Sequence, residues 1–155
     1  MENKIKLYLD TSVYGGFYDL EFAEVTKALF EKINKGEFLV FYSEIVEKEL
    51  SKAPEIVRNI FNKIPKEYKL ELEITREVNS LARAYINEKA VGETSYEDCR
   101  HIAMSSIYNI DVLVSWNFKH IVNLKRIKDY NRINKVYGYN YLEIRTPNEL
   151  IYGTV

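Results

Sequence analysis

Acidic side chains stand at three points of the sequence where an apolar segment ends or a helical pattern begins. Asp10 directly follows residues 4–9, whose alternation of apolar and polar side chains predicts a strand. Glu49 and Asp98 lie on later helical segments, and Asn117 follows a buried strand pattern. Carboxylates that converge without a cation repel one another, and one of them must take up a proton. Because hard oxygen ligands suit Mg²⁺ or Mn²⁺, the set predicts a divalent metal site.

Each of these acids also has a purely structural interpretation. Asp10 could cap the helix that follows it. Ser95 and Asp98 have the spacing of a capping box, which would place the acid at a helix N-terminus for structural reasons alone. Glu44 and Glu47, on the same helix as Glu49, could face solvent or contribute to the site. Both interpretations stay open at this point.

The two histidines and Asp111 are set apart from the predicted site. His101 and His120 could indicate zinc, but single histidines on different elements are more often structural, and we interpret them so. Asp111 begins its predicted strand and therefore lies at the opposite edge of the sheet from Asp10.

Composition predicts one globular domain spanning residues 1–155. Hydrophobic residues make up 46% of the chain and charged residues 29%, as in ordinary globular proteins. No apolar run approaches the roughly 20 residues that cross a bilayer, and the N-terminus has no apolar signal-peptide core. With one cysteine, Cys99, an intramolecular disulfide and a cysteine zinc site are excluded. We therefore expect a cytoplasmic protein with no membrane association.

Basic residues are concentrated between positions 119 and 135, although the net charge of −1 does not indicate a nucleic-acid partner. The stretch contains one acid, Asp129, and six basic residues: Lys119, Lys125, Arg126, Lys128, Arg132 and Lys135. Such a stretch could follow a phosphate backbone, or it could be a solvated helix face.

Strand and helix patterns alternate along the whole chain. Strand patterns occupy residues 4–9, 38–42, 68–74, 112–116 and 141–144. Helical patterns occupy residues 20–35, 44–50, 54–64, 75–90 and 95–108, and a last helix begins at Thr146-Pro147. A glycine pair, Gly15-Gly16, is interpreted as a break. This alternation predicts an α/β fold with three α/β/α layers around a mainly parallel central sheet.

Four motifs in this order resemble those of PIN-domain nucleases, the fold of the VapC toxins. They are Leu9-Asp10-Thr11-Ser12, the helix 43–50 with Glu49 before a leucine, Asp98 opening a helix rich in small residues, and the strand-to-Asn step 114–120. Residues 146–149 also resemble the ending of one PIN subgroup. The resemblance implies a PIN-like fold and Mg²⁺- or Mn²⁺-dependent hydrolysis of RNA.

The resemblance also implies roles for individual residues and partners. Asp10, Glu49 and Asp98 would be the metal ligands, and Asn117, where many family members carry a fourth acid, leaves the number of ions open. Thr11 and Ser12 would orient ligands or phosphate. The RNA backbone would be held by basic residues of the 119–135 stretch: Lys119, Lys125, Arg126 and Lys128. A cognate antitoxin and a homodimer are expected by resemblance only.

Three other classes compete with this interpretation. A haloacid dehalogenase-type phosphatase would use Asp10 as a nucleophile but needs a second acid where Ser12 stands. A response-regulator receiver needs an early acidic pair and a phosphorylatable Asp after the third strand, and no suitable Asp follows residues 40–43. The strongest alternative is a catalytically weak or inactive PIN-like module that binds RNA or a protein, and Asn117 favours it.

Overall fold

The computed structural model describes residues 3–92 and 96–153, and in them five strands form one parallel sheet with the order β3-β2-β1-β4-β5. The strands are β1 (Ile5–Leu9), β2 (Phe38–Tyr42), β3 (Lys69–Glu71), β4 (Val112–Val114) and β5 (Glu143–Arg145). All four neighbouring pairs are parallel. The predicted α/β class with a parallel central sheet is therefore confirmed.

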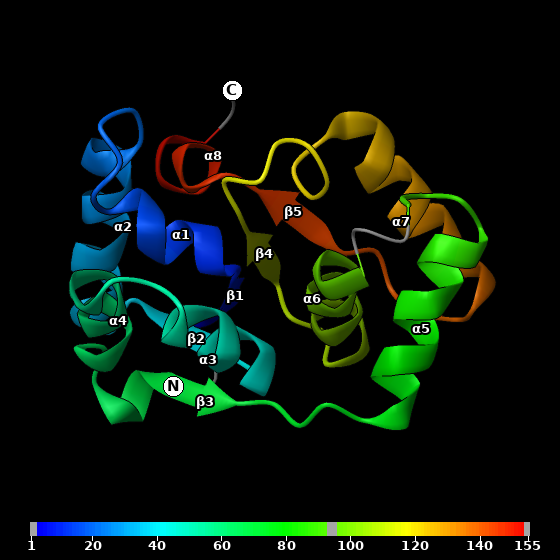
Figure 1. Cartoon of the computed structure of the whole chain (residues 1–155), viewed down its shortest axis with the longest axis horizontal. Helices are drawn as coiled ribbons and strands as arrows, with labels where there is room; N and C mark the ends of the chain where they lie inside the picture. Colours follow the sequence, from blue (N-terminus) through cyan, green and yellow to red (C-terminus); the bar gives the residue numbers. More distant parts are fainter. Residues whose placement is uncertain (1–2, 93–95, 154–155) are drawn as a thin grey trace.

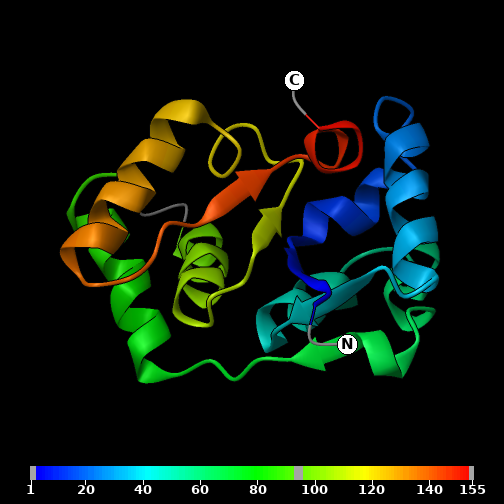
Figure 2. The ribbon, with the colours of Figure 1, turned by 180° about the vertical axis from the view of Figure 1, so that it is seen from behind.

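Helices cover both faces of the sheet, which gives the three predicted layers (Figures 1 and 2). One group consists of α1 (Thr11–Gly16), α2 (Ala23–Asn34), α4 (Glu55–Asn62) and α8 (Pro147–Tyr152). The other consists of α5 (Arg76–Asn87), α6 (Tyr96–Ile107) and α7 (Leu124–Val136). The helix α3 (Glu44–Ser51) follows β2, and the short 3-10 helix η1 (Lys66–Tyr68) precedes β3.

Because helices lie on both faces, the central strand is more buried than its alternation predicts. Leu7, Tyr8 and Leu9 are all fully buried, although Tyr8 belongs to the polar half of the alternating pattern. The hydroxyl of Tyr8 lies 2.8 Å from Ser43 Oγ, so its polar end has a partner inside the protein. β1 therefore leads from the middle of the core straight to Asp10.

The largest departure from the sequence prediction is α1, which occupies the glycine pair interpreted as a break. Gly16 ends α1 against the indole ring of Trp116, where a Cβ atom would lie 2.7 Å from the ring. The contact requires a residue without a side chain. The smaller differences are at the ends of elements. β3 ends at Glu71 and β4 at Val114, earlier than the predicted ends at 74 and 116, and α2 begins at Ala23 instead of position 20.

Two further features bear on the predictions. The stretch 119–135 overlaps α7 from Leu124 onward, so most of its basic residues stand on a helix. The last helix begins as predicted, because Thr146 and Glu149 form a capping box and Pro147 takes the first helical position. No helix in the described ranges is long and apolar enough to cross a membrane.

Candidate metal centre

Asp10 lies at the carboxyl end of β1 with its carboxylate held by two hydroxyl groups. Ser12 Oγ and Ser115 Oγ each donate to Asp10 Oδ2 at 2.7 Å. The residue is 5% exposed, and its backbone N–H donates to Val114 O. Asp10 occupies the N-cap position of α1, but its side chain makes no cap hydrogen bond. The capping interpretation of Asp10 therefore fails, and its carboxylate faces the carboxyl edge of the sheet instead.

Glu49, on α3, brings a second carboxylate to the same place. Its Oε1 atom accepts a hydrogen bond from Thr11 Oγ1 and lies 3.0 Å from His101 Nε2. Burial raises the pKa of the Glu49 carboxyl, but the hydrogen bonds and charge of His101, with the Thr11 hydroxyl, outweigh burial and leave the pKa below its ordinary value. Glu49 is therefore ionised at neutral pH.

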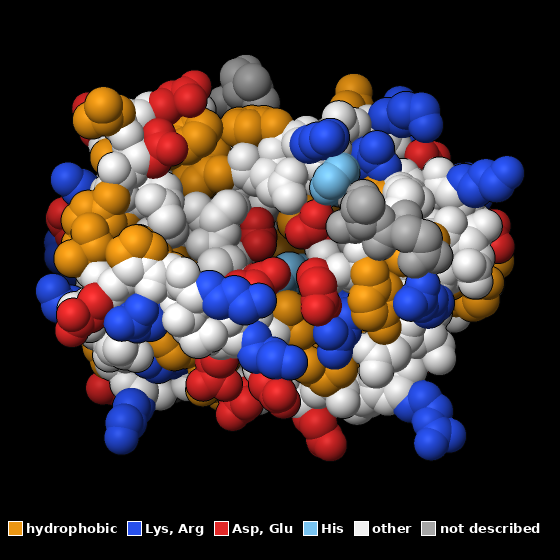
Figure 3. Space-filling model, in the orientation of Figure 1, with side chains coloured by type: hydrophobic (Ala, Val, Ile, Leu, Met, Phe, Trp, Pro, Cys, Tyr) orange, Lys and Arg blue, Asp and Glu red, His pale blue; other side chains and the backbone are white. Residues whose placement is uncertain are grey.

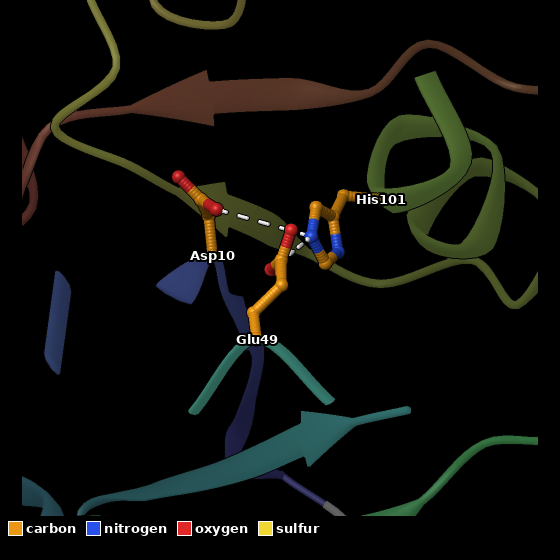
Figure 4. Close-up of side chains that lie close together, drawn as sticks. All are labelled: Asp10, Glu49 and His101. Carbon is orange, nitrogen blue, oxygen red and sulfur yellow. Dashed lines mark hydrogen bonds and ion pairs between the residues drawn. The ribbon is translucent and has the colours of Figure 1, made fainter. Parts of the chain in front are cut away.

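His101, on α6, completes this group from the opposite side (Figure 4). Its ring is fully buried, with Nε2 3.9 Å from Asp10 Oδ1 and Nδ1 2.8 Å from the hydroxyl of Tyr8. Ligand atoms of Asp10, Glu49 and His101 all lie within 4.8 Å of one another, and we call these three residues the inner cluster.

The charge of His101 is set by its neighbours. Burial lowers the pKa of the imidazole, but the hydrogen bond to Glu49 and the charges of Asp10, Glu49 and Asp98 raise the pKa above its ordinary value. In its protonated form the ring donates from Nε2 to Glu49. The raised pKa favours that charged form beside the carboxylates, and the interpretation of His101 as a structural residue outside the site missed this arrangement. The spacing from Asp98 to His101, about one helical turn on one face, is the sequence signal that could have found it.

Asp98 belongs to a second group at the same edge of the sheet. Its Oδ2 atom lies 3.1 Å from His120 Nδ1 and accepts a hydrogen bond from Asn117 Nδ2 at 3.4 Å. We call Asp98, Asn117 and His120 the outer cluster. Burial and the charge of Asp10 raise the pKa of the Asp98 carboxyl despite the opposing effects of both histidines. The predicted capping partner Ser95 lies outside the described residues.

Asn117 also organises the loop between β4 and α7. Its Oδ1 atom accepts hydrogen bonds from the backbone N–H groups of Lys119 and His120, at 3.1 and 3.0 Å. Its own N–H donates to Ser115 Oγ, the hydroxyl that holds Asp10. The loop is thereby tied to the inner cluster through Ser115.

Thr11 and Ser12 direct their hydroxyl groups to the carboxylates of Glu49 and Asp10. Ser12 Oγ also accepts a hydrogen bond from the backbone N–H of Trp116. Of the two roles predicted for these hydroxyls, the geometry favours orienting the acids over contacting phosphate.

Three further acids considered above lie outside the two clusters, although Glu44 lines a hollow together with Glu49. Glu44 and Glu47 are exposed on α3, and burial together with Glu71 and Glu44 raises the pKa of Glu47. Asp111 accepts a hydrogen bond from the backbone N–H of Lys6, next to the start of β1. It therefore lies at the opposite end of the sheet, as predicted.

The basic residues predicted to hold RNA divide into two groups. Lys119, Lys125 and Arg126 line one hollow of about 640 Å³, together with Lys89. Lys128 is exposed and is not part of that lining. Figure 3 shows the corresponding face of the molecule, with acidic side chains and a histidine gathered in its middle and basic side chains toward α7.

The three-dimensional arrangement agrees with that of a known protein. A chain of the crystal structure of VapBC2 from Rickettsia felis bound to a DNA fragment from their promoter superposes with a TM-score of 0.56 at 14% identity. The match covers 92% of this chain and 98% of that chain. The chain has a PIN-like fold. No protein-family model and no curated protein matches the sequence, so the fold is the level at which the likeness holds.

Proposed function

We propose that this PIN-like protein is a metal-dependent endoribonuclease of the VapC toxin kind. The observation that carries the proposal is the inner cluster, in which a buried carboxylate, a second carboxylate and a histidine meet within 4.8 Å at the carboxyl edge of the sheet. In open α/β folds this edge is where ligands bind.

The donor set fits Mg²⁺ or Mn²⁺. Within the described residues, Asp10 Oδ1, Glu49 Oε2 and Asp98 Oδ1 accept no hydrogen bond. One oxygen of each carboxylate is thus left for an ion, while the other oxygen fixes the side chain; Asp98 stands outside the 4.8 Å group, and its role as a third ligand is part of the proposal. Oxygen ligands from separate elements, with room for water, are typical of sites for these two metals.

In the proposed hydrolysis, the chain provides acidic side chains that would hold the ion and basic side chains that would hold the RNA. Asp10, Glu49 and Asp98 would hold a Mg²⁺ or Mn²⁺ ion, which would supply a water of lowered pKa and stabilise charge on the phosphate oxygens. Ser12 and Ser115 hold Asp10 so that its free oxygen faces the site, and Thr11 holds Glu49. The basic hollow beside α7 holds the RNA backbone through charge, which reads shape more than sequence.

The proposal includes a biological setting. A VapC-like toxin acts with a cognate antitoxin, and we include such a partner in the proposal because the structural neighbour is a VapBC2 complex. A homodimer and a cytoplasmic location, where RNA substrates are found, belong to the same proposal.

A second candidate function is a PIN-like module that binds RNA or protein without cleaving it. The observation that favours it is the position of His101, whose Nε2 lies 3.0 Å from Glu49 and 3.9 Å from Asp10, because its protonated form supplies positive charge to the inner cluster without a metal. Asn117, a neutral residue in the outer cluster, points the same way because it cannot act as a fourth acidic ligand.

Cleavage of mixed RNA separates the two functions. We expect the purified protein to cut RNA with Mn²⁺ and to be inactive with a chelator. Asp10→Asn should reduce the rate by at least about 100-fold, since even residues that support metal ligands cost 10–100-fold. Asp111→Asn, the same change at the opposite end of the sheet, is the matched control and should cut as the parent does. RNA binding without metal-dependent cleavage would decide for the binding module.

A further inference from the structure

An apolar groove lies beside the metal centre, at the carboxyl ends of β4 and β5. It has a volume of about 560 Å³ and is lined mainly by apolar side chains, among them Phe22, Trp116, Phe118, Leu124 and Ile127, with the polar side chains of Glu21 and Thr146 also in the lining. Asn148 and Glu149, at the start of α8, lie on its rim. Figure 3 shows hydrophobic side chains exposed on this face between the ends of α2 and α8. An apolar floor with a few polar groups is typical of a small-molecule or base pocket.

Phe118 is the aromatic ring that the groove offers to a ligand. Its ring is 51% exposed, and it packs against Phe22 and Trp116 with centroid distances of 6.0 and 6.1 Å. Trp116 itself is covered, because Phe22 stacks on it at 4.1 Å and Gly16 lies against its ring edge. Phe118 is therefore held in place by two aromatic rings while half of its surface remains open.

The groove is joined directly to the metal centre. Trp116 donates its backbone N–H to Ser12 Oγ at 3.0 Å, and that hydroxyl donates to Asp10. Asn117, the next residue, donates to Asp98 of the outer cluster. The groove and the metal centre are thus joined through one short segment of backbone, residues 116–117.

The basic hollow adjoins the groove across the same short segment of chain. Lys119 follows Phe118, and Lys125 follows Leu124, so alternate sides of the segment line the hollow and the groove. Four basic residues and no acid are found among the side chains that line the hollow within the described chain. The hollow therefore complements phosphate, and the groove beside it complements an uncharged aromatic group.

We infer that the groove binds one unstacked nucleobase of a single-stranded RNA, stacked on Phe118, while the adjacent phosphates occupy the basic hollow. This inference rests on the proposed function and names the feature of RNA that the site reads. Single-stranded bases stack readily on exposed aromatic rings, and every base has a face suited to this contact. A peptide would fill the groove but would leave the basic hollow without a counter-charge.

The single tryptophan of the chain reports on the groove, because Trp116 lies in its floor. We would titrate the protein, in a chelator to prevent cleavage, with a short single-stranded RNA and with an abasic ribose-phosphate chain of the same length. The RNA should quench Trp116 fluorescence and bind roughly tenfold more tightly than the abasic chain. Equal affinity and equal quenching for both chains would overturn the inference.

Variants of Phe118 separate stacking from simple apolar contact. Phe118→Leu should lose roughly tenfold in affinity for RNA and none for the abasic chain, whereas Phe118→Tyr should retain RNA affinity. Tyr137→Leu, which removes another ring that is 51% exposed but lies outside the groove, is the control and should bind as the parent does. RNA affinity unchanged in Phe118→Leu would indicate a groove for an apolar peptide and would overturn base binding.

Cleavage distinguishes this inference from the proposed function. Suppose that the protein cleaves RNA with Mn²⁺, but binds the abasic chain as tightly as RNA and keeps its RNA affinity in Phe118→Leu. The nuclease then stands and the base site is wrong. If base-dependent quenching occurs without cleavage, the base site stands and the nuclease is wrong.

Discussion

The inner and outer clusters each pair a carboxylate with a histidine, but they differ in how firmly the fold holds them. His101 is fully buried with both ring nitrogens in contact with partners, whereas the side chain of His120 is 21% exposed. The inner acids accept hydrogen bonds from three hydroxyl groups, and Asp98 accepts from a loop amide at 3.4 Å. The side chains of the inner cluster are thus fixed by the fold without a ligand, whereas those of the outer cluster lie beside an exposed loop.

This difference indicates a division of roles. Side chains fixed by packing and hydrogen bonds hold a ligand geometry with little reorganisation, which suits the positioning of an ion. Side chains at a loop can adjust to a substrate, and the loop from 115 to 123 carries Phe118 and two members of the outer cluster, Asn117 and His120, while Asp98 stands on α6. The experiments below test whether the inner cluster is the rigid half of the site and the outer cluster the adaptable half.

The largest expected effect is on stability in the absence of metal, where substitutions of Asp10 and Asp98 should have opposite effects. Asp10→Asn removes the charge that two hydroxyl groups stabilise, so the free energy of unfolding should fall by about 1.5–3 kcal/mol. Asp98→Asn should have the opposite effect and raise the melting temperature at pH 7.5, because the raised pKa of Asp98 means that its ionised form is disfavoured in the folded protein. Thermal unfolding in a chelator measures both.

Added Mn²⁺ supplies the control for that comparison. The parent should melt higher with Mn²⁺, since an ion that binds the folded state stabilises it, and both variants should lose most of that shift. A Mn²⁺ shift that persists in both variants would contradict the proposed metal site.

The next effect concerns His101 and depends on pH. The raised pKa of His101 contributes stability below its unfolded pKa of about 6.5, and this is lost as pH rises through the folded pKa. The lowered pKa of Glu49 contributes stability above its unfolded pKa of about 4.3, and this is lost as pH falls through the folded pKa. The ion pair between His101 and Glu49 therefore contributes most to the free energy of unfolding near pH 5.5.

We expect His101→Gln to cost about 1–2 kcal/mol more at pH 5.5 than at pH 9, a value reduced for the partial exposure of Glu49. Denaturant unfolding at the two pH values, in a chelator, measures the difference. If His101→Gln lowers the free energy of unfolding equally at both pH values, the charge of His101 does not stabilise the inner cluster.

A smaller effect is expected at Asn117. Asn117→Asp keeps an acceptor for the loop N–H groups but replaces the donor to Asp98 with a second carboxylate. Without metal the variant should unfold at lower temperature, and with Mn²⁺ it should bind the ion several-fold more tightly, because opposite charges at a site strengthen binding. Calorimetric titration measures affinity and stoichiometry. Unchanged affinity would place Asn117 outside the range of the ion.

The smallest effect concerns two lysines that are one helical turn apart on α7. Lys125 lines the basic hollow, and Lys128 does not. Lys125→Gln should reduce the slope of log affinity for RNA against log salt by about 1, and Lys128→Gln should leave it unchanged. Filter binding over a range of salt concentrations measures the slopes. Equal slopes in the two variants would indicate that residues 119–135 form a solvated helix face and do not bind RNA.

Local patterns were sufficient for most of the fold. Continuous apolar segments such as 38–42 and 112–116 predicted strands buried on both faces, and the helical spacing of α2, α5 and α6 was visible because packing against a sheet requires an apolar stripe. The position of Asp10 after β1 followed from the same patterns.

The parts that escaped prediction depend on residues far apart in the chain. α1 could not be predicted, since Gly16 is explained by Trp116, a contact that exists only in the folded protein. His101 was misjudged for the same reason, because its partners Tyr8 and Glu49 lie on other elements. Long-range pairing, rather than local preference, places these residues in the site.

The strand order has a consequence for how the protein is made. Between β1 and β4, the hydrogen bond from Ser115 to Asp10 joins residues 105 positions apart. At synthesis rates of about 5–20 residues per second, a ribosome needs roughly 5–20 s to produce the partner of Asp10 after Asp10 itself. During that interval β1 can pair with β2 on one edge while its other edge is open to any available strand. A nascent chain of this protein therefore carries an incomplete centre, and the centre is completed late in translation.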